Sequence, residues 1–129
     1  MKVLMLNGSP RKDGNTSIAV LDRLFYSSHF DETMKVGASV VCARRGGCSA
    51  TFDELNKYFT ISNMPIASSQ YWNSIHGRAQ GEAEMDEEGK QTMRVLARNM
   101  VFLMKSIALG KEKFGLPETE ERVATHFIR

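Results

Sequence analysis

The sequence has few cysteines and no long apolar run, and each shortage excludes a class of protein. Only two of its 129 residues are cysteines, Cys42 and Cys48. That is too few for a disulfide scaffold, and the clustered ligands of a zinc or iron–sulfur site are missing. No run is long enough for a membrane-spanning helix, and the opening apolar run is too short for a secretory leader. We therefore expect one cytoplasmic domain over residues 1–129, with free thiols.

The chain also lacks an excess of charge of either sign. Its net charge is +2, and the lysines and arginines are interleaved with acidic residues. Nucleic acids and anionic membranes are bound by concentrated basic surfaces. The composition therefore indicates neither nucleic acid nor a membrane as the main partner. A hydrophobic content of 42% is adequate for one core in a chain of this length.

What the sequence does contain is a strand, a loop and a helix start near its beginning. The apolar run 3–6 stops at Asn7 and Gly8, and a helix is predicted to begin at Asn15 or Thr16. The first amides of a helix have no intrahelical partner and attract anions. Side chains that can donate hydrogen bonds to a phosphate lie in the same segment: Ser9, Arg11, Asn15 and Thr16. The loop therefore predicts a phosphate site.

Two common phosphate loops do not match this spacing. A Walker loop has four residues between its glycines and a lysine after the second, whereas five residues separate Gly8 from Gly14 and Asn15 follows. The dinucleotide fingerprint requires glycine where Pro10 lies. An ordinary strand-to-helix turn, with Asn15 as the helix N-cap, is the alternative to a phosphate site.

Residues 8–16, Gly-Ser-Pro-Arg-Lys-Asp-Gly-Asn-Thr, resemble the phosphate-binding loop of the NADPH-dependent FMN reductase and iron–sulfur flavoprotein family, in the flavodoxin-like superfamily. The resemblance implies an α/β fold: a three-layer flavodoxin-like parallel sheet, shortened to about three strands, with helices on both faces. It also implies FMN as cofactor and NADPH as electron donor. By the same resemblance, the FMN phosphate would be surrounded by Ser9, Arg11, Gly14, Asn15 and Thr16.

The resemblance extends along almost the whole chain, but in two pieces that join between Val20 and Leu21. The family carries further βαβ units between these points, including a loop against the flavin ring and the cysteines of its iron–sulfur members. This chain lacks them, so no iron–sulfur cluster is expected. Two functions stay open: an FMN-dependent NAD(P)H oxidoreductase, or a truncated, non-catalytic flavodoxin-like protein with reduced or no flavin binding. Because a shortened sheet leaves an edge uncovered, we expect homo-oligomers.

The rest of the sequence predicts strands alternating with helices. Strands are predicted over 35–43 and 66–72, with a polar loop over 73–84. The first helix should end at about Ser27, and a second should begin at a capping box that starts with Thr51. The longest helix should run from an Asp86 N-cap to a Gly110 C-cap.

A second loop, 44–49, follows the predicted strand 35–43. Carboxyl ends of parallel strands meet at one edge of a sheet, so this loop should lie beside the first one. The resemblance implies that Arg44, Gly46 and Gly47 touch the flavin ring, and the alternative is a solvated arginine pair beside a glycine turn. Cys48 lies near a helix start and an arginine, which can lower a thiol pKa, but an inert cysteine is expected. No carboxylate or nucleophile lies at a sequence spacing from His76 that is typical of a catalytic pair, and His76 is assigned no role.

Overall fold

The computed structural model describes residues 21–27, 31–121 and 123–127 and has a mixed α/β architecture. A π-helical turn, η1 (Asp22–Tyr26), comes first. It is followed by strand β1 (Val41–Ala43), helix α2 (Cys48–Ile61) and strand β2 (Ser74–His76). A 3₁₀ turn, η2 (Glu82–Met85), then leads into the long helix α3 (Glu87–Phe114). The predicted strand 3–6 and the phosphate-loop residues Ser9, Arg11, Gly14, Asn15 and Thr16 lie outside the described residues.

The two described strands form a small parallel sheet. Val41 pairs with Ser74 and Ala43 with His76, and an isolated parallel bridge joins Gly37 to Ile66 further upstream. The predicted strand 35–43 is therefore shorter than expected. The predicted strand 66–72 is wrong, because β2 lies within the segment 73–84 that was predicted to be a loop.

Local hydrogen bonds explain why the second strand begins late. The Ser69 hydroxyl donates to the carbonyl of Tyr71 at 2.6 Å and accepts from the Tyr71 amide at 3.3 Å. A serine that satisfies nearby backbone groups in this way competes with the hydrogen-bond ladder of a sheet. The chain therefore turns at 69–71 and rejoins the sheet only where the Val41 amide donates to the Asn73 carbonyl.

Helix α2 begins at Cys48, so the capping box predicted at Thr51 is wrong. The N-cap is Gly47, which has a φ of 91° and provides no side-chain cap. Glycine adopts this left-handed conformation without the strain that a Cβ atom would cause. The Thr51 amide donates to the Gly47 carbonyl at 3.1 Å, which places Thr51 inside the first turn.

Helix α3 confirms the predicted start and corrects the predicted end. The Asp86 side chain accepts a hydrogen bond from the Gly89 amide at 2.9 Å, as an N-cap does. The helix passes through Gly110 and continues to Phe114, with Gly115 as its C-cap. A glycine inside a helix costs only about 1 kcal/mol relative to alanine, so Gly110 alone does not stop a long helix. In the described part of the chain, no helix is both long and apolar enough to cross a membrane.

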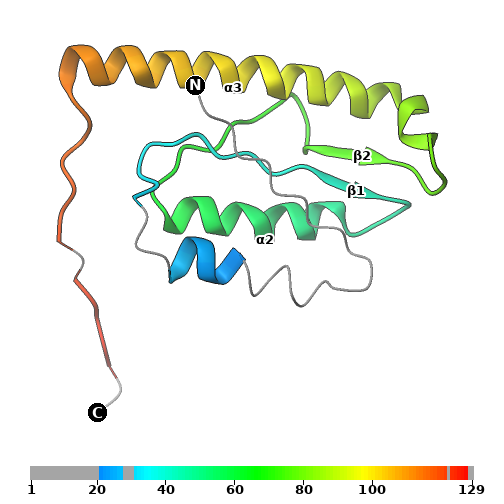
Figure 1. Ribbon diagram of the computed structural model, residues 1–129. Helices are drawn as coiled ribbons and strands as arrows, with labels where there is room; N and C mark the ends of the chain where they lie inside the picture. The colour runs from blue at the N-terminus through cyan, green and yellow to red at the C-terminus, as the bar shows by residue number, and fades with distance from the viewer. Residues whose placement is uncertain (1–20, 28–30, 122, 128–129) are drawn as a thin grey trace.

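The helices lie on opposite sides of the two strands, with α3 along one side and α2 on the other (Figure 1). The most deeply buried apolar residues are Cys48, Ala67 and Leu96. Asn73 is also buried, at 1% exposed, and its side-chain amide has no hydrogen-bond partner in the described structure. The carboxyl ends of β1 and β2 lie at the same edge of the sheet, where the loops that leave them meet.

Candidate functional site

A cavity of about 210 Å³ extends from the carboxyl edge of β1 and β2 along β2 to the residues that precede it, and we call it the rim cavity. Its lining consists of the loop and helix start 45–49, the aromatic pair Tyr71 and Trp72, and the β2 residues Ser74 and His76. In open parallel sheets, ligands bind outside the carboxyl ends of the strands. The rim cavity therefore occupies the position where the fold class places a binding site.

The loop 44–49 contributes backbone to this cavity. Gly46 and Gly47 line it, and a Cβ atom built on either residue would meet nothing within 4 Å. A ligand can therefore approach the main chain closely at this point. Arg45 also lines the cavity, whereas Arg44 does not, although both arginines are exposed. Of the three residues expected to touch a flavin ring, the structure places Gly46 and Gly47 in the wall and Arg44 outside it.

The start of α2 presents unpaired amides to the same region. The first intrahelical bond is donated by Thr51, so the amides of Cys48, Ser49 and Ala50 have no acceptor among the described residues. These amides, together with the helix dipole, favour negative charge beside the cavity. The exposed guanidinium group of Arg45 adds positive charge at the same place.

Three side chains that the sequence pattern does not connect lie next to one another beside the rim cavity. Cys48 Sγ lies 3.8 Å from His76 Nε2, and His76 Nδ1 lies 3.7 Å from Asp86 Oδ2. Burial and the nearby charge of Cys42 raise the pKa of the Cys48 thiol. From the sequence alone, Cys48 is expected to be inert and His76 is assigned no role. Cys48 begins α2 and His76 ends β2, so both residues lie at the carboxyl edge of the sheet. Because the second strand was predicted over 66–72, the sequence did not place His76 at this edge.

Asp86 is the best-fixed member of this group. Its carboxylate accepts hydrogen bonds from the Gly89 amide at 2.9 Å and the His76 amide at 2.7 Å, and these bonds lower its pKa. The folded pKa therefore lies below the unfolded value of about 3.9. This stabilisation is complete above the unfolded pKa and is lost as the pH falls through the folded pKa.

We expect the free energy of unfolding of Asp86→Asn to depend less on pH in the acid range than that of the wild type. Asparagine is also a good N-cap, so the helix start is retained while the ionisable group is removed. Unfolding midpoints measured from pH 7 to pH 2 should show a wild-type advantage at neutral pH that shrinks in acid. The control is Glu88→Gln, at an exposed position in the same helical turn, which should follow the wild-type curve. A constant difference between wild type and Asp86→Asn at every pH would contradict the assignment.

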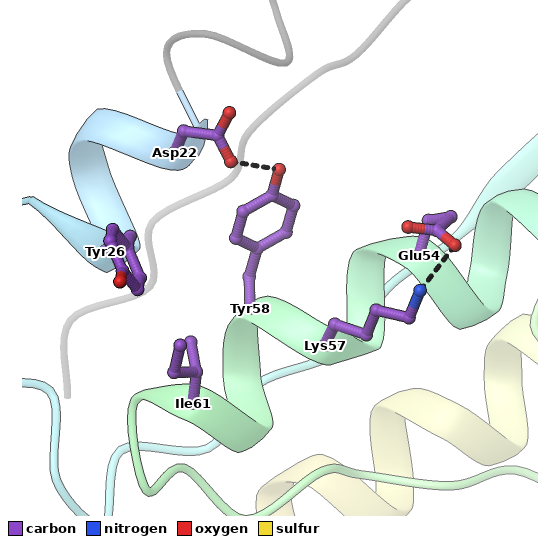
Figure 2. A pocket seen from close by; sticks show the side chains of 6 residues that line it. All are labelled: Asp22, Tyr26, Glu54, Lys57, Tyr58 and Ile61. Carbon is purple, nitrogen blue, oxygen red and sulfur yellow. Dashed lines mark hydrogen bonds and ion pairs between the residues drawn. The ribbon is translucent and has the colours of Figure 1, made fainter. Parts of the chain in front are cut away.

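A second cavity, of about 250 Å³, lies between η1 and α2 (Figure 2). Tyr58 Oη donates to Asp22 Oδ1 at 2.7 Å, and Lys57 Nζ lies 2.6 Å from Glu54 Oε1. The hydrogen bond to Asp22 and desolvation raise the pKa of Tyr58, which keeps the phenol protonated. Asp22 is thus paired with Tyr58 and Glu54 with Lys57, and this cavity lies away from the strand ends. We therefore place the candidate site at the rim cavity.

Comparison of the chain with protein-family models, curated proteins and solved structures found no match. In the described part of the chain, no three histidine, cysteine or acidic side chains are grouped as metal ligands. The site is therefore interpreted from its own residues.

Proposed function

We propose that the protein is an FMN-dependent NAD(P)H oxidoreductase of the flavin reductase type, with a shortened flavodoxin-like sheet. The observation that carries this proposal is the open glycine backbone at Gly46 and Gly47, at the carboxyl edge of two parallel strands. The resemblance of residues 8–16 to a flavin phosphate loop supports it from the sequence. The flavin itself supplies hydride chemistry, so the protein needs to bind and orient it rather than provide an acid or base.

The rim cavity offers contacts suited to a planar, electron-poor ring. Tyr71 and Trp72 are both exposed, and their rings meet at a centroid distance of 4.7 Å. Aromatic faces pack favourably against a flat heterocycle. The unpaired amides at the start of α2 can donate to ring oxygens or to a phosphate. A second copy of the chain would cover the sheet edge left by the shortened fold.

Binding of FMN is the test of this function. We expect the protein to quench flavin fluorescence on titration, and Asn15→Asp to weaken binding at least about tenfold, because it sets a carboxylate against the phosphate. Asn63→Asp is the matched control. Asn63 is exposed near the opposite end of α2, roughly 20 Å from the rim cavity by helix length.

The outcomes separate the alternatives. FMN-dependent oxidation of NADPH supports the reductase. Absence of FMN binding by the folded protein supports the truncated, non-catalytic alternative, for which the missing ring-contacting loop is the reason. Tight binding that Asn15→Asp and Asn63→Asp leave equally unchanged would show that residues 9–16 do not hold the phosphate.

A further inference from the structure

A thiol, an imidazole and a carboxylate from three different elements lie next to one another beside the rim cavity. Cys48 is the first residue of α2, His76 is the last residue of β2, and Asp86 is the N-cap of α3. The sulfur lies 3.8 Å from His76 Nε2, and the other ring nitrogen lies 3.7 Å from the Asp86 carboxylate. A nucleophile, a base and a group that orients the base are thus placed in the order that covalent catalysis requires.

The positions of the partners favour one tautomer of His76. A carboxylate beside Nδ1 favours the tautomer with hydrogen on that nitrogen, which leaves the lone pair of Nε2 directed at the Cys48 thiol. The thiol can then pass its proton to Nε2, and the resulting imidazolium is stabilised by Asp86. Because burial disfavours a free thiolate at Cys48, the thiol depends on this base for its reactivity.

Asp86 is held rigidly enough to orient the ring. Its two carboxylate oxygens accept hydrogen bonds from the backbone amides of Gly89 and His76. Gly89 leaves no spare room, since a Cβ atom there would lie 2.8 Å from Ile75 Cγ1. The carboxylate therefore cannot turn away from His76 without loss of the α3 cap.

The surroundings of Cys48 also suit the charge that develops in acyl transfer. The amides of Cys48 and Ser49 have no acceptor among the described residues, and they belong to the same helix start as the sulfur, so they are available to an oxyanion that forms there. Cys48 is 8% exposed, and its open side lines the rim cavity. A volume of about 210 Å³ admits a small acyl group and part of an aromatic leaving group against Tyr71 and Trp72.

We propose that Cys48 is the nucleophile of an acyl-transfer site that cleaves activated esters or thioesters with small acyl groups, with His76 as general base and Asp86 as positioning residue. Cys48 Sγ bonds to the acyl carbon while its proton moves to His76 Nε2, and the alcohol or thiol leaves with its bonding electron pair. Where the leaving group needs a proton, His76 returns it; where it departs as a stable anion such as p-nitrophenolate, His76 releases the proton to solvent and is neutral again before the next step. Water, deprotonated by His76, then attacks the acyl-enzyme, releases the carboxylic acid and restores the thiol. The activity requires no cofactor and is independent of the flavin proposal.

Hydrolysis of p-nitrophenyl acetate by the full chain, freed of any flavin, tests the site. We expect a burst of p-nitrophenolate equal to one acetyl group per chain, and an acetyl adduct on the peptide that contains Cys48. Cys48→Ser, which is nearly isosteric, and Cys48→Ala should each lower turnover at least about a hundredfold. Cys42→Ser removes the other thiol, which is exposed, and should change turnover less than about twofold.

The roles of the two partners are separated by conservative variants. His76→Gln should lower turnover by a similar factor to Cys48→Ser. Asp86→Asn keeps the α3 cap but favours the wrong tautomer, so kcat should fall at least about tenfold with little change in KM. The dependence of the rate of Cys48 alkylation by iodoacetamide on pH should differ from that of the wild type in both variants. The other titratable groups that face this thiol are Arg45, from the loop, and Cys42, from β1.

Several results would overturn the proposal. They are absence of hydrolysis by the folded wild-type chain, an acetyl adduct on Cys42 or on lysines but not on Cys48, and unchanged turnover in Cys48→Ser. An alkylation profile in His76→Gln that matches the wild-type profile would remove His76 as the base. Circular dichroism of each variant shows that a loss of activity is not a loss of folding.

Discussion

Replacement of Leu96 by alanine is expected to lower the free energy of unfolding by about 2–5 kcal/mol. Leu96 is 4% exposed and lies on the face of α3 that also buries Gly89 and Thr92. Because few apolar residues in the described chain are fully buried, the cavity left by the lost side-chain atoms has little chance of being filled. Chemical denaturation monitored by circular dichroism measures the change.

Leu109→Ala is the matched control for this prediction. Leu109 belongs to the same helix but is 54% exposed. The substitution should alter the free energy of unfolding by no more than about 0.5 kcal/mol, because the side chain is already largely in solvent and alanine has a high helix propensity. If both variants lost stability equally, α3 would not pack on β2 through the face that contains Leu96.

The second large effect is expected at Gly37, where the backbone lies against the Phe59 ring of α2. A Cβ atom at Gly37 would lie 2.6 Å from Cγ of Phe59. The Phe59 ring is held in turn by Phe25, edge to face at a centroid distance of 5.8 Å. Gly37 also joins the bridge to Ile66, so its backbone cannot shift without loss of the pairing. The extra methyl group therefore has to be accommodated by displacement of a packed ring.

We expect Gly37→Ala to lower the free energy of unfolding by about 1–3 kcal/mol. The reduced freedom of the unfolded chain offsets only about 0.4–1 kcal/mol of this cost. Gly46→Ala is the matched control, since a Cβ atom there meets nothing within 4 Å. It should be neutral or slightly stabilising in the same denaturation experiment. A neutral Gly37→Ala variant would mean that Phe59 does not pack against this strand segment.

Structural features that depend on residues a few positions apart could be predicted from the sequence. The N-cap at Asp86 depends only on a side chain three residues before the amide it accepts from, and the structure confirms it. The wrong prediction of a helix start at Thr51 also has a local cause. A capping box and a left-handed glycine competed for the same helix start, and Gly47 determined it.

Features that depend on long-range pairing could not be predicted in the same way. The bounds of β2 follow from its register with β1 and from the Ser69 turn, neither of which leaves a periodic pattern in the sequence. The meeting of Cys48 with His76 depends on those bounds, since the two residues are 28 positions apart. The place of Gly46 and Gly47 after the carboxyl end of a strand could be predicted from the end of that strand alone, and their contact with a flavin ring stays a prediction. The residues expected around a phosphate, at 9–16, stay predictions.

The aromatic wall of the rim cavity contains an intrinsic fluorophore. The chain has a single tryptophan, and it is Trp72, with its indole half-exposed to the space a ligand would fill. Its emission originates at the site and nowhere else in the chain, so unlabelled protein reports occupancy optically. Trp72→Phe would silence that reporter while an aromatic face is retained.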